Sequence, residues 1–456
     1  MVGRDKRTRK KSIVIVGANS AGVTAAAEAR KRDRRIEITL ISDEAYPPYS
    51  RCGLPYVLSG EVPSFEELLL FPPPFFEDMR IDLRLRSKVK HVNPKEKTIE
   101  VEHLEGETES LDYDSLILAT GAASRIPPIP GIEKKGVFSL RTLEDGMKIQ
   151  DAMKNASSAI VVGAGFIGLE LAHALVRRDI ETTVTESSPQ ILPRMIDEDM
   201  AEIAQEKIEE HGLRVMVGRS VEKILGDGEV SGVVVRRGEI DAEIVLFAAG
   251  VVPRVELPSE IGMRLGVTGA IEVNPRMETS IPHVYAAGDC VESSNMVTGR
   301  PTISALGTTA ARQGKVAGAN AVGGHSVFPG VLDSVVSTMF GFEVGGTGLT
   351  ESHAHQEGLE TISGSIASKT RAEYYPGGKD IVVKIVAEPD TGRVIGGQIV
   401  GGEEVTQRIN IVSIAIQKQM NVWELSKADT CYAPSVCTPW EPVILAAETT
   451  TKQAKH

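Results

Sequence analysis

The sequence of 456 residues is poor in cysteine and in aromatic side chains. Only four cysteines occur, widely spaced, and aromatic residues make up 4% of the chain. Four dispersed cysteines do not make the disulfide framework that is typical of small secreted proteins. We therefore expect a reducing, cytoplasmic setting in which a single thiol can be reactive.

Long apolar runs and an excess of positive charge are also missing. No stretch approaches the roughly 20 apolar residues of a membrane span. The basic N-terminus leads into a strand and a glycine turn, so we expect no secretory signal. A net charge of −12 argues against a general nucleic-acid-binding protein. The nine histidines show no spacing typical of metal ligands, and we predict no metal site.

Glycine, in contrast, is abundant at 44 residues, and short β-branched runs alternate with alanine-rich segments. This alternation is typical of βαβ units with parallel sheets. Two such units occur in the chain, which predicts two Rossmann-like dinucleotide-binding domains. The predicted elements are strands over 12–16, 36–41, 159–162 and 181–185, with helices over 22–32 and from 168 to about 178.

The segment GAGFIGLE carries a complete G-x-G-x-x-G pattern in Gly163, Gly165 and Gly168. It follows an apolar strand and opens a helix, which is the context that a dinucleotide-binding fingerprint requires. The glycines permit a tight turn, close approach of a pyrophosphate, and close packing of helix on strand. Glu186 ends the next strand, where it can accept from a ribose 2′-hydroxyl, and no arginine follows, which favours NADH over NADPH. Ile167 lies in the same cofactor-binding turn.

The segment GANSAG is an imperfect version of this pattern, because Asn19 stands in place of the middle glycine between Gly17 and Gly22. Its support is the same strand–turn–helix context. Asp43 and Glu44 follow the second strand, and either carboxylate is a candidate for the ribose or for a solvated turn. Ser20 and Ala21 complete this predicted cofactor-binding loop.

Two further segments identify the kind of protein. They are ATG, with Thr120 and Gly121, and YAAGD, with Gly288 and Asp289. With both fingerprints, these segments resemble the signatures of the pyridine nucleotide–disulfide oxidoreductases over nearly the full chain. The resemblance implies an FAD in the first nucleotide fold and NADH in the second. It also implies that Asp289 binds the ribityl or pyrophosphate region of FAD.

The same resemblance implies a division of the chain and two more cofactor-binding residues. Gly250 is expected to line the NADH site. Glu170 is expected near the nicotinamide, with a helix-surface carboxylate as the alternative. The FAD-binding domain is expected to be split, so that the predicted domains are FAD-binding 1–122, NADH-binding 123–252, FAD-binding 253–325, and a C-terminal α+β dimerisation domain 326–456.

Cys52 lies in PPYSRCGLPYVLSGE with no second cysteine nearby. Most members of the family carry a Cys-x-x-x-x-Cys pair, and the second position here is Val57. The segment instead resembles the single-cysteine branch, which contains coenzyme A disulfide reductases, persulfide or polysulfide reductases, NADH oxidases and NADH peroxidases. Pro55 and Gly60 predict a short helix after Cys52. The helix N-terminus and Arg51 are expected to lower the pKa of the thiol, while the alternative is an inert, buried cysteine.

Ser20 separates two activities within this branch. NADH oxidases and peroxidases typically carry histidine at this position of the first fingerprint, and serine cannot supply a proton near neutral pH as imidazole does. We therefore expect a disulfide, persulfide or polysulfide as electron acceptor. The alternative is an oxidase or peroxidase that cycles Cys52 through a sulfenic acid.

A second thiol region, ADTCYAPSVCTPWEP, lies near the C-terminus. It resembles the segment that reaches across the family dimer, where coenzyme A disulfide reductases place a tyrosine. Val436 takes that position here, and Tyr432 is a candidate substitute proton donor. Cys431 and Cys437 are candidates for a relay with Cys52 of a partner subunit, for a clamp that holds a soft ion or sulfane sulfur, or for structural cysteines.

The predicted protein is therefore an FAD-dependent NADH oxidoreductase of α/β fold that acts on a sulfur acceptor through Cys52. A homodimer is expected from the resemblance. A redox carrier or sensor that docks a protein partner, such as a sulfur carrier, through Cys431 and Cys437 is a further alternative.

Overall fold

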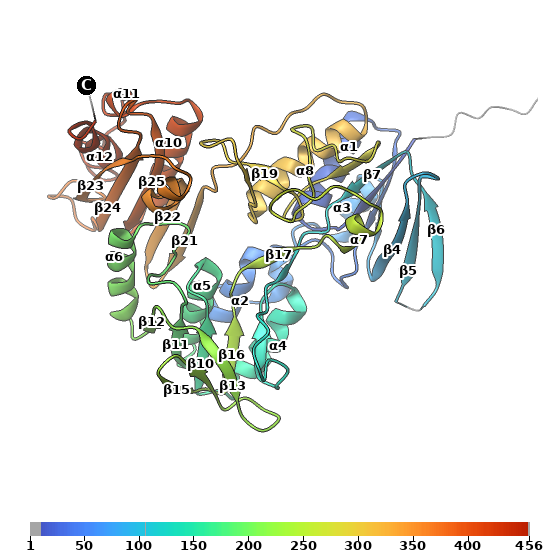
Figure 1. The fold of residues 1–456 in the computed structure, drawn as a ribbon, viewed down its shortest axis with the longest axis horizontal. Coiled ribbons are helices and arrows are strands. Elements are labelled where there is room, and N and C mark those ends of the chain that lie inside the picture. Colours follow the sequence, from blue (N-terminus) through green and yellow to red (C-terminus); the bar gives the residue numbers. More distant parts are fainter. Residues whose placement is uncertain (1–10, 105, 455–456) are drawn as a thin grey trace, which may run out of the picture.

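The computed structural model describes residues 11–104 and 106–454, so the basic segment 1–10 and residues 455–456 of the predicted domains lie outside it. Figure 1 shows two nucleotide-binding folds, with the C-terminal sheet at one side of them, at the upper left of the view. The first fold has a parallel sheet in the order β18-β7-β1-β2-β3. Its strands are β1 (Ser12–Val16), β2 (Glu37–Ile41), β3 (Ile81–Arg84), β7 (Ser115–Leu118) and β18 (Val284–Ala286).

Helix α1 (Ser20–Arg32) packs on α8 (Gly307–Ala321), although the two are separated by most of the chain. A side chain at Gly314 or Gly318 would overlap the backbone of α1, so both glycines are needed for this close approach. Helix α1 begins two residues before its predicted start because the Asn19 side chain accepts from the Ser20 amide. An antiparallel sheet of β4 (Ser87–Asn93), β5 (Thr98–His103) and β6 (Thr108–Asp112) adjoins this fold.

The second fold repeats the arrangement with a parallel sheet in the order β12-β11-β10-β16-β9. Its strands are β9 (Val137–Ser139), β10 (Ser158–Val162), β11 (Glu181–Thr185), β12 (Arg214–Met216) and β16 (Ile244–Phe247). Its helices are α4 (Leu143–Met153), α5 (Phe166–Val176) and α6 (Glu198–Glu209), and a small sheet is formed by β13 (Val221–Leu225), β14 (Gly232–Val235) and β15 (Gly238–Asp241).

A two-stranded ribbon joins the two folds. Strand β8 (Ala122–Ser124) leaves the first fold, and β17 (Val251–Pro253) returns to it in antiparallel pairing. The predicted boundaries at residues 122/123 and 252/253 fall within this ribbon. Because β18 and α8 follow the return, the first nucleotide fold is assembled from two separate stretches of sequence.

The C-terminal region is an antiparallel sheet in the order β21-β22-β25-β24-β23. Its strands are β21 (Val335–Met339), β22 (Phe342–Gly348), β23 (Ile362–Lys369), β24 (Asp380–Ala387) and β25 (Val394–Gly401). Helices α10 (Val405–Gln417) and α12 (Pro442–Thr451) pack on it, and their apolar faces bury one core with β24 and β25. The shorter helices α9 (Glu351–Gln356) and α11 (Val422–Leu425) complete the region.

The C-terminal sheet also packs on the second nucleotide fold of the same chain. Lys384 of β24 forms ion pairs with Asp197 and Asp199 at the start of α6, and Gln398 of β25 donates to Asp197. Strand β21 packs on α5. This contact brings a strand of the C-terminal region to the helix that follows the second fingerprint.

The segment around Cys52 belongs to the first fold by sequence but packs on the second. A 3₁₀ turn, η1 (Arg51–Gly53), continues into α2 (Leu54–Ser59), which packs on α5 and α4. Leu54, Val57 and Leu58 are at most 1% exposed in a core that they share with Leu171 and Leu175 of α5. Burial of these apolar side chains fixes the Cys52 turn between the two nucleotide folds.

The remaining short elements are η2 (Phe65–Leu68), α3 (Pro73–Asp78), α7 (Glu256–Glu260), β19 (Ser293–Ser294) and β20 (Pro301–Thr302). Within the described residues, none of the helices has the length and apolar character that crossing a membrane requires.

Candidate active site

Cys52 is a free, exposed thiol at the start of a helical segment. Pro55 lies in the first turn of α2, and Gly60 ends it with φ +82°. Val57, at the position of the second cysteine of the family pair, is buried in the apolar core. No internal disulfide can therefore form at this position, and the alternative of a buried Cys52 does not hold.

The expected lowering of the Cys52 pKa is wrong. Desolvation by the surrounding protein atoms raises the pKa of the thiol, although the residue keeps an exposed surface, and the charges of Glu170 and Asp289 raise it further. The Arg51 guanidinium pairs with Glu44 and donates to the Arg141 carbonyl oxygen, and the cation that lowers the pKa of Cys52 is Arg141. Arg51 therefore braces the loop and does not supply the positive charge.

Arg141 provides the positive charge at the thiol instead. Its charge lowers the pKa of Cys52, in opposition to the two carboxylates. Its Nη2 donates to Asp289 Oδ2 at 2.5 Å, and both side chains are largely buried. Arg141 directly precedes the capping box that Thr142 and Asp145 form at the start of α4. Sequence reasoning missed Arg141, since no motif marks it.

Glu170 is held on the other side of the thiol. It lies in the second turn of α5, where burial raises the pKa of its carboxyl, and Ser337 Oγ of β21 donates to Glu170 Oε1 at 2.5 Å. The alternative of a solvated helix-surface carboxylate is therefore wrong. Burial, followed by the charges of Glu170, Glu61 and Cys52, raises the pKa of Tyr56 of α2. Sequence reasoning missed both Tyr56 and Ser337.

The first fingerprint forms the predicted turn. Gly17 has φ +105°, and a Cβ there would overlap the Ala119 carbonyl oxygen. A Cβ at Gly22 would overlap the Gly17 carbonyl oxygen. Asn19, at the middle position of the pattern, is the N-cap residue of α1, and its side chain accepts a hydrogen bond from the Ser20 amide. This position therefore stabilises the start of the helix as well as lying where a ligand would bind.

The acidic residues after β2 divide into two kinds. Glu44 accepts from the Tyr49 hydroxyl at 2.5 Å and pairs with Arg51, so it organises the Cys52 loop. Asp43 is half exposed and pairs with Arg254 at 3.5 Å. In the first fold, the last residue of β1 pairs with Ile41, and Ser42 follows. In the second fold, the last residue of β10 pairs with Thr185, and Glu186 follows. Ser42 is therefore the counterpart of Glu186. No motif in the sequence marks Ser42 as the residue at this position.

The second fingerprint is more open. Gly163 has φ +110° and Gly168 packs against its carbonyl oxygen, whereas a Cβ at Gly165 would meet no atom within 4 Å. Ile167 is exposed at the first turn of α5. Glu186 is buried, and its carboxylate accepts from the Ala164 amide at 2.9 Å and the Ser188 amide at 2.7 Å. The carboxylate therefore lies directly against the fingerprint loop.

Four more predicted residues surround these two loops. Thr120 Oγ1 donates to the Arg254 carbonyl oxygen at 2.9 Å, and Gly121 has φ +68°. Gly288 has φ +92° and packs against Ala21 at the start of α1. Gly250, with φ +95°, has open space beside it.

Cys290, the residue after Asp289, is buried, and desolvation raises the pKa of its thiol. It packs in the apolar core of the first fold with Leu118 and Val291, which is the environment of a structural residue.

The C-terminal cysteines are both free. Cys437 is buried in its own loop, where its Sγ accepts from the Ala433 amide at 3.3 Å, while Cys431 is exposed. Tyr432 is exposed, and its hydroxyl lies 3.3 Å from that of Tyr374. Within the described residues, the charges that most affect the pKa of Cys52 belong to other elements and not to this C-terminal loop.

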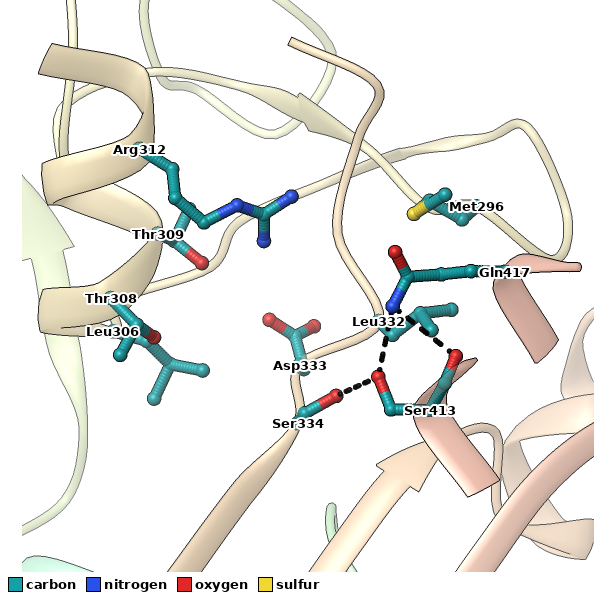
Figure 2. A pocket seen from close by; sticks show the side chains of 10 residues that line it. All are labelled: Met296, Leu306, Thr308, Thr309, Arg312, Leu332, Asp333, Ser334, Ser413 and Gln417. Carbon is teal, nitrogen blue, oxygen red and sulfur yellow. Dashed lines mark hydrogen bonds between the residues drawn. The ribbon is translucent and has the colours of Figure 1, made fainter. Parts of the chain in front are cut away.

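A small cavity of about 60 Å³ lies between α8 and α10 and does not include Cys52. Figure 2 shows Arg312 from α8 facing Asp333, with Ser413 and Gln417 hydrogen-bonded to one another on the far wall. The cavity is thus separate from the thiol site.

The two loops fit the dinucleotides that the sequence predicts. In each fold, a glycine turn and the N-terminus of a helix lie at the carboxyl end of a parallel sheet. The two helices, α1 and α5, have 13 and 11 residues. Folds of this kind bind phosphate groups at that place. The first fold would hold FAD through the loop at residues 17–22 and the loop at Asp289. The second would hold the nicotinamide nucleotide through Gly165 and Glu186.

Comparisons with known proteins agree with this arrangement. Residues 11–314 match the model of the pyridine nucleotide-disulphide oxidoreductases, and residues 335–441 match the dimerisation domain of that family. The chain is 43% identical to an NADH oxidase of Methanocaldococcus jannaschii, with 97% of this chain and 99% of the relative covered. It is 33% identical to an NAD(P)H coenzyme A polysulfide/persulfide reductase of Pyrococcus horikoshii, with 96% and 98% covered.

Among solved structures, an NAD-dependent persulfide reductase from A. fulgidus has a TM-score of 0.94 at 37% identity, with 97% of this chain and 83% of that chain covered. These matches confirm the predicted fold class and cofactors. The chain belongs to the pyridine nucleotide-disulphide oxidoreductase family and is an NAD(P)H oxidoreductase that uses FAD.

Proposed function

We propose that the protein uses NADH to reduce the sulfur–sulfur bond of a persulfide, polysulfide or disulfide through Cys52. The observation that carries the proposal is a single free thiol, exposed between the two nucleotide folds, whose usual partner position is the buried Val57. A thiol with no internal partner forms its redox-active bond with a substrate sulfur. The relatives named as polysulfide/persulfide reductase and persulfide reductase support this acceptor class.

The proposed step is thiol–disulfide exchange. The Cys52 thiolate attacks one sulfur of the acceptor and forms a new S–S bond, while the old S–S bond breaks and the second sulfur leaves with the electron pair. Arg141 favours the thiolate form, whereas Glu170 and Asp289 oppose it. FAD and NADH, when bound, supply the two electrons that restore the thiol.

NADH is the proposed nicotinamide donor. The fixed carboxylate of Glu186 suits a ribose 2′-hydroxyl and repels a 2′-phosphate. Arg219, the arginine that follows β12 closely, directs its Nη1 to the Arg236 carbonyl oxygen. The kcat/KM for NADH is therefore expected to exceed that for NADPH.

The experiment is an anaerobic reduction by NADH followed by re-oxidation with a panel of acceptors. The panel contains polysulfide, coenzyme A persulfide, coenzyme A disulfide, glutathione disulfide, peroxide and oxygen. A sulfur acceptor is expected to react fastest, and Cys52→Ser is expected to lose that reaction. Ferricyanide, which takes electrons from a reduced flavin without a thiol, is the internal control and should still be reduced by Cys52→Ser. Full sulfur reduction by Cys52→Ser would contradict the proposal.

A second candidate function is favoured by the 43% identity to a protein named NADH oxidase. In that function the Cys52 thiolate attacks one oxygen of peroxide and forms the S–O bond of a sulfenic acid, while the O–O bond breaks and the second oxygen leaves as hydroxide. The residue at position 20 is serine, whose hydroxyl lies 3.4 Å from Asn19 Oδ1, so this site lacks an imidazole proton donor. Faster NADH consumption with oxygen or peroxide than with every sulfur acceptor would favour the oxidase.

We further propose that the enzyme is a cytoplasmic homodimer in which Cys431 and Cys437 of one subunit serve Cys52 of the other, with Tyr432 as a proton donor. The match of residues 335–441 to a dimerisation domain supports the dimer. In the relay, the sulfur acceptor first oxidises the two free C-terminal thiols to a disulfide and is itself reduced. The Cys52 thiolate then attacks this disulfide, forms an S–S bond with one of the two cysteines and releases the other as a thiolate. The same exposed Cys431 is the proposed contact for a sulfur-carrier protein. Unchanged turnover with all acceptors in a Cys431→Ala, Cys437→Ala double variant would overturn the relay.

A further inference from the structure

The two-residue turn that joins β21 to β22 contains a residue in an unfavourable conformation. Phe340 and Gly341 have φ +48° and +78°, so both lie in the left-handed region, as in the tight type I′ turn of a hairpin. Glycine adopts this conformation without strain, whereas a bulky side chain adopts it rarely. A strained residue persists only where its surroundings hold it. The tip of this hairpin is therefore held by contacts from outside the hairpin.

Two imidazole rings lie against the Phe340 side chain, which is 5% exposed. The ring of His173, on α5, meets it edge to face with the centroids 4.7 Å apart, and the ring of His211, after α6, lies 5.7 Å away. His173 also holds the backbone of the turn, because the Phe340 amide donates to His173 Nδ1 at 3.3 Å. An Nδ1 that accepts carries no proton, so the imidazole is neutral and its proton is on Nε2.

The second nitrogen of His173 reaches the segment that begins at Cys52. His173 Nε2 lies 3.3 Å from Oε1 of Glu61, which follows the end of α2. Arg177, one turn further along the chain, contacts the same carboxylate oxygen at 3.3 Å. His173 is thus the point at which α5, the end of the Cys52 helix and the tip of the C-terminal hairpin meet.

We propose that His173 is a positioning residue that acts as a proton-sensitive latch: its neutral imidazole holds the β21–β22 hairpin on α5, and its protonation releases the hairpin. A proton on Nδ1 turns the acceptor of the Phe340 amide into a donor, so this hydrogen bond is lost. The strand that leads to the tip carries Ser337, whose hydroxyl donates to Glu170 of α5. Release of the tip therefore loosens the contact that holds this carboxylate near Cys52. The latch does not depend on which acceptor Cys52 reduces.

The direction of the pH dependence follows from the groups that face the imidazole. Burial lowers the pKa of His173, Glu61 opposes this shift, and the charges of Arg177 and His211 add to it. Because Glu61 already pairs with Arg177, it stabilises an imidazolium less than a free carboxylate would. A released imidazole has the ordinary pKa of about 6.5. The hairpin is therefore closed at neutral pH and opens more readily as the pH falls below about 6.5, until the pH passes the lowered pKa of the closed form.

The test is hydrogen exchange of the FAD-loaded holoenzyme, read by mass spectrometry of peptides that cover residues 335–348. The protection factor, which removes the intrinsic pH dependence of exchange, should fall at least about 3-fold in the wild type between about pH 7 and about pH 5. In His173→Asn, the side-chain oxygen replaces Nδ1 as acceptor and takes no proton in this range, so protection should stay near the neutral wild-type value.

His211→Asn is the matched control. Its imidazole also faces Phe340, but its Nδ1 lies 2.8 Å from the Lys207 carbonyl oxygen of α6, so the variant should keep the wild-type pH dependence. His173→Leu removes the acceptor, and its hairpin should exchange at neutral pH at least as fast as that of the wild type in acid. If leucine unfolds the chain, the asparagine variant still decides the question.

Three results would overturn the latch. The first is a wild-type protection factor that does not change with pH, and the second is a pH dependence that survives in His173→Asn. The third is an equal fall of protection in peptides of β1 and β2, because that would be a general loosening of the molecule and not a release of the hairpin.

Discussion

The two nucleotide folds of this chain have the same frame and different ligand-facing residues. In both, the last residue of the first strand pairs with the last residue of the second, Val16 with Ile41 and Val162 with Thr185. In both, the first and third glycines are enforced by nearby carbonyl oxygens. The frame is therefore set by backbone packing that is independent of the bound nucleotide.

The differences lie where a ligand would touch. The middle position is Asn19 in the first fold, where it caps a helix, and the open Gly165 in the second. The residue after the second strand is Ser42 in the first and Glu186 in the second. Residues that maintain the frame and residues that select the ligand can therefore be changed separately.

The largest expected effect separates the frame from the ligand within one fingerprint. A Cβ at Gly168 would overlap the Gly163 carbonyl oxygen, so Gly168→Ala should lower the free energy of unfolding by about 3 kcal/mol, the upper range of overpacking costs. A Cβ at Gly165 meets no protein atom within 4 Å, so Gly165→Ala should melt like the wild type but bind NADH at least about 10-fold more weakly. Thermal unfolding and NADH titration check the pair.

Equal melting temperatures for Gly168→Ala and Gly165→Ala would contradict this division. Unchanged NADH binding by Gly165→Ala would remove the role of the open position.

How much the sequence could predict follows the same division. The strands, glycine turns and helix starts are local patterns, and the structure reproduces them within two residues. The site depends on contacts between distant residues, such as Arg141 with Asp289 and Ser337 with Glu170, which lie 148 and 167 positions apart. The predicted pKa of Cys52 was wrong for this reason, since desolvation and two distant carboxylates outweigh the local helix terminus.

The second prediction replaces Glu186, the residue after the second strand of the second fold, with serine, the residue at the same position of the first fold (Ser42). Glu186→Ser removes the carboxylate that faces the fingerprint loop, so the KM for NADH should rise about 10-fold, which is about 1.4 kcal/mol of binding. The kcat should change little, because the carboxylate binds the ribose equally before and during reaction. Steady-state kinetics with NADH and NADPH check this, and an unchanged ratio of the two kcat/KM values would show that Glu186 does not select the cofactor.

The third prediction compares what each fold contributes to the thiol. Glu170 belongs to the second fold and Asp289 to the first, and the charge of each raises the pKa of Cys52, Glu170 by more. Glu170→Gln and Asp289→Asn should therefore lower that pKa, the first by more, so that a larger fraction of Cys52 is thiolate at neutral pH. Alkylation of Cys52 by iodoacetamide as a function of pH, followed by peptide mass spectrometry, measures the shift. A rise in the pKa with Glu170→Gln would contradict the prediction.

The smallest expected effect comes from giving the first fold the complete glycine pattern of the second. Asn19→Gly removes the side-chain cap on the Ser20 amide, and glycine in place of an asparagine N-cap costs only a few tenths of a kcal/mol. The frame glycines Gly17 and Gly22 stay in place, so FAD should remain bound. A melting temperature close to that of the wild type, with full FAD content by absorbance, would show that Asn19 is a substitute for glycine rather than a requirement. Loss of FAD would instead show that the first fold depends on the asparagine, and that the two fingerprints bind their pyrophosphates in different ways.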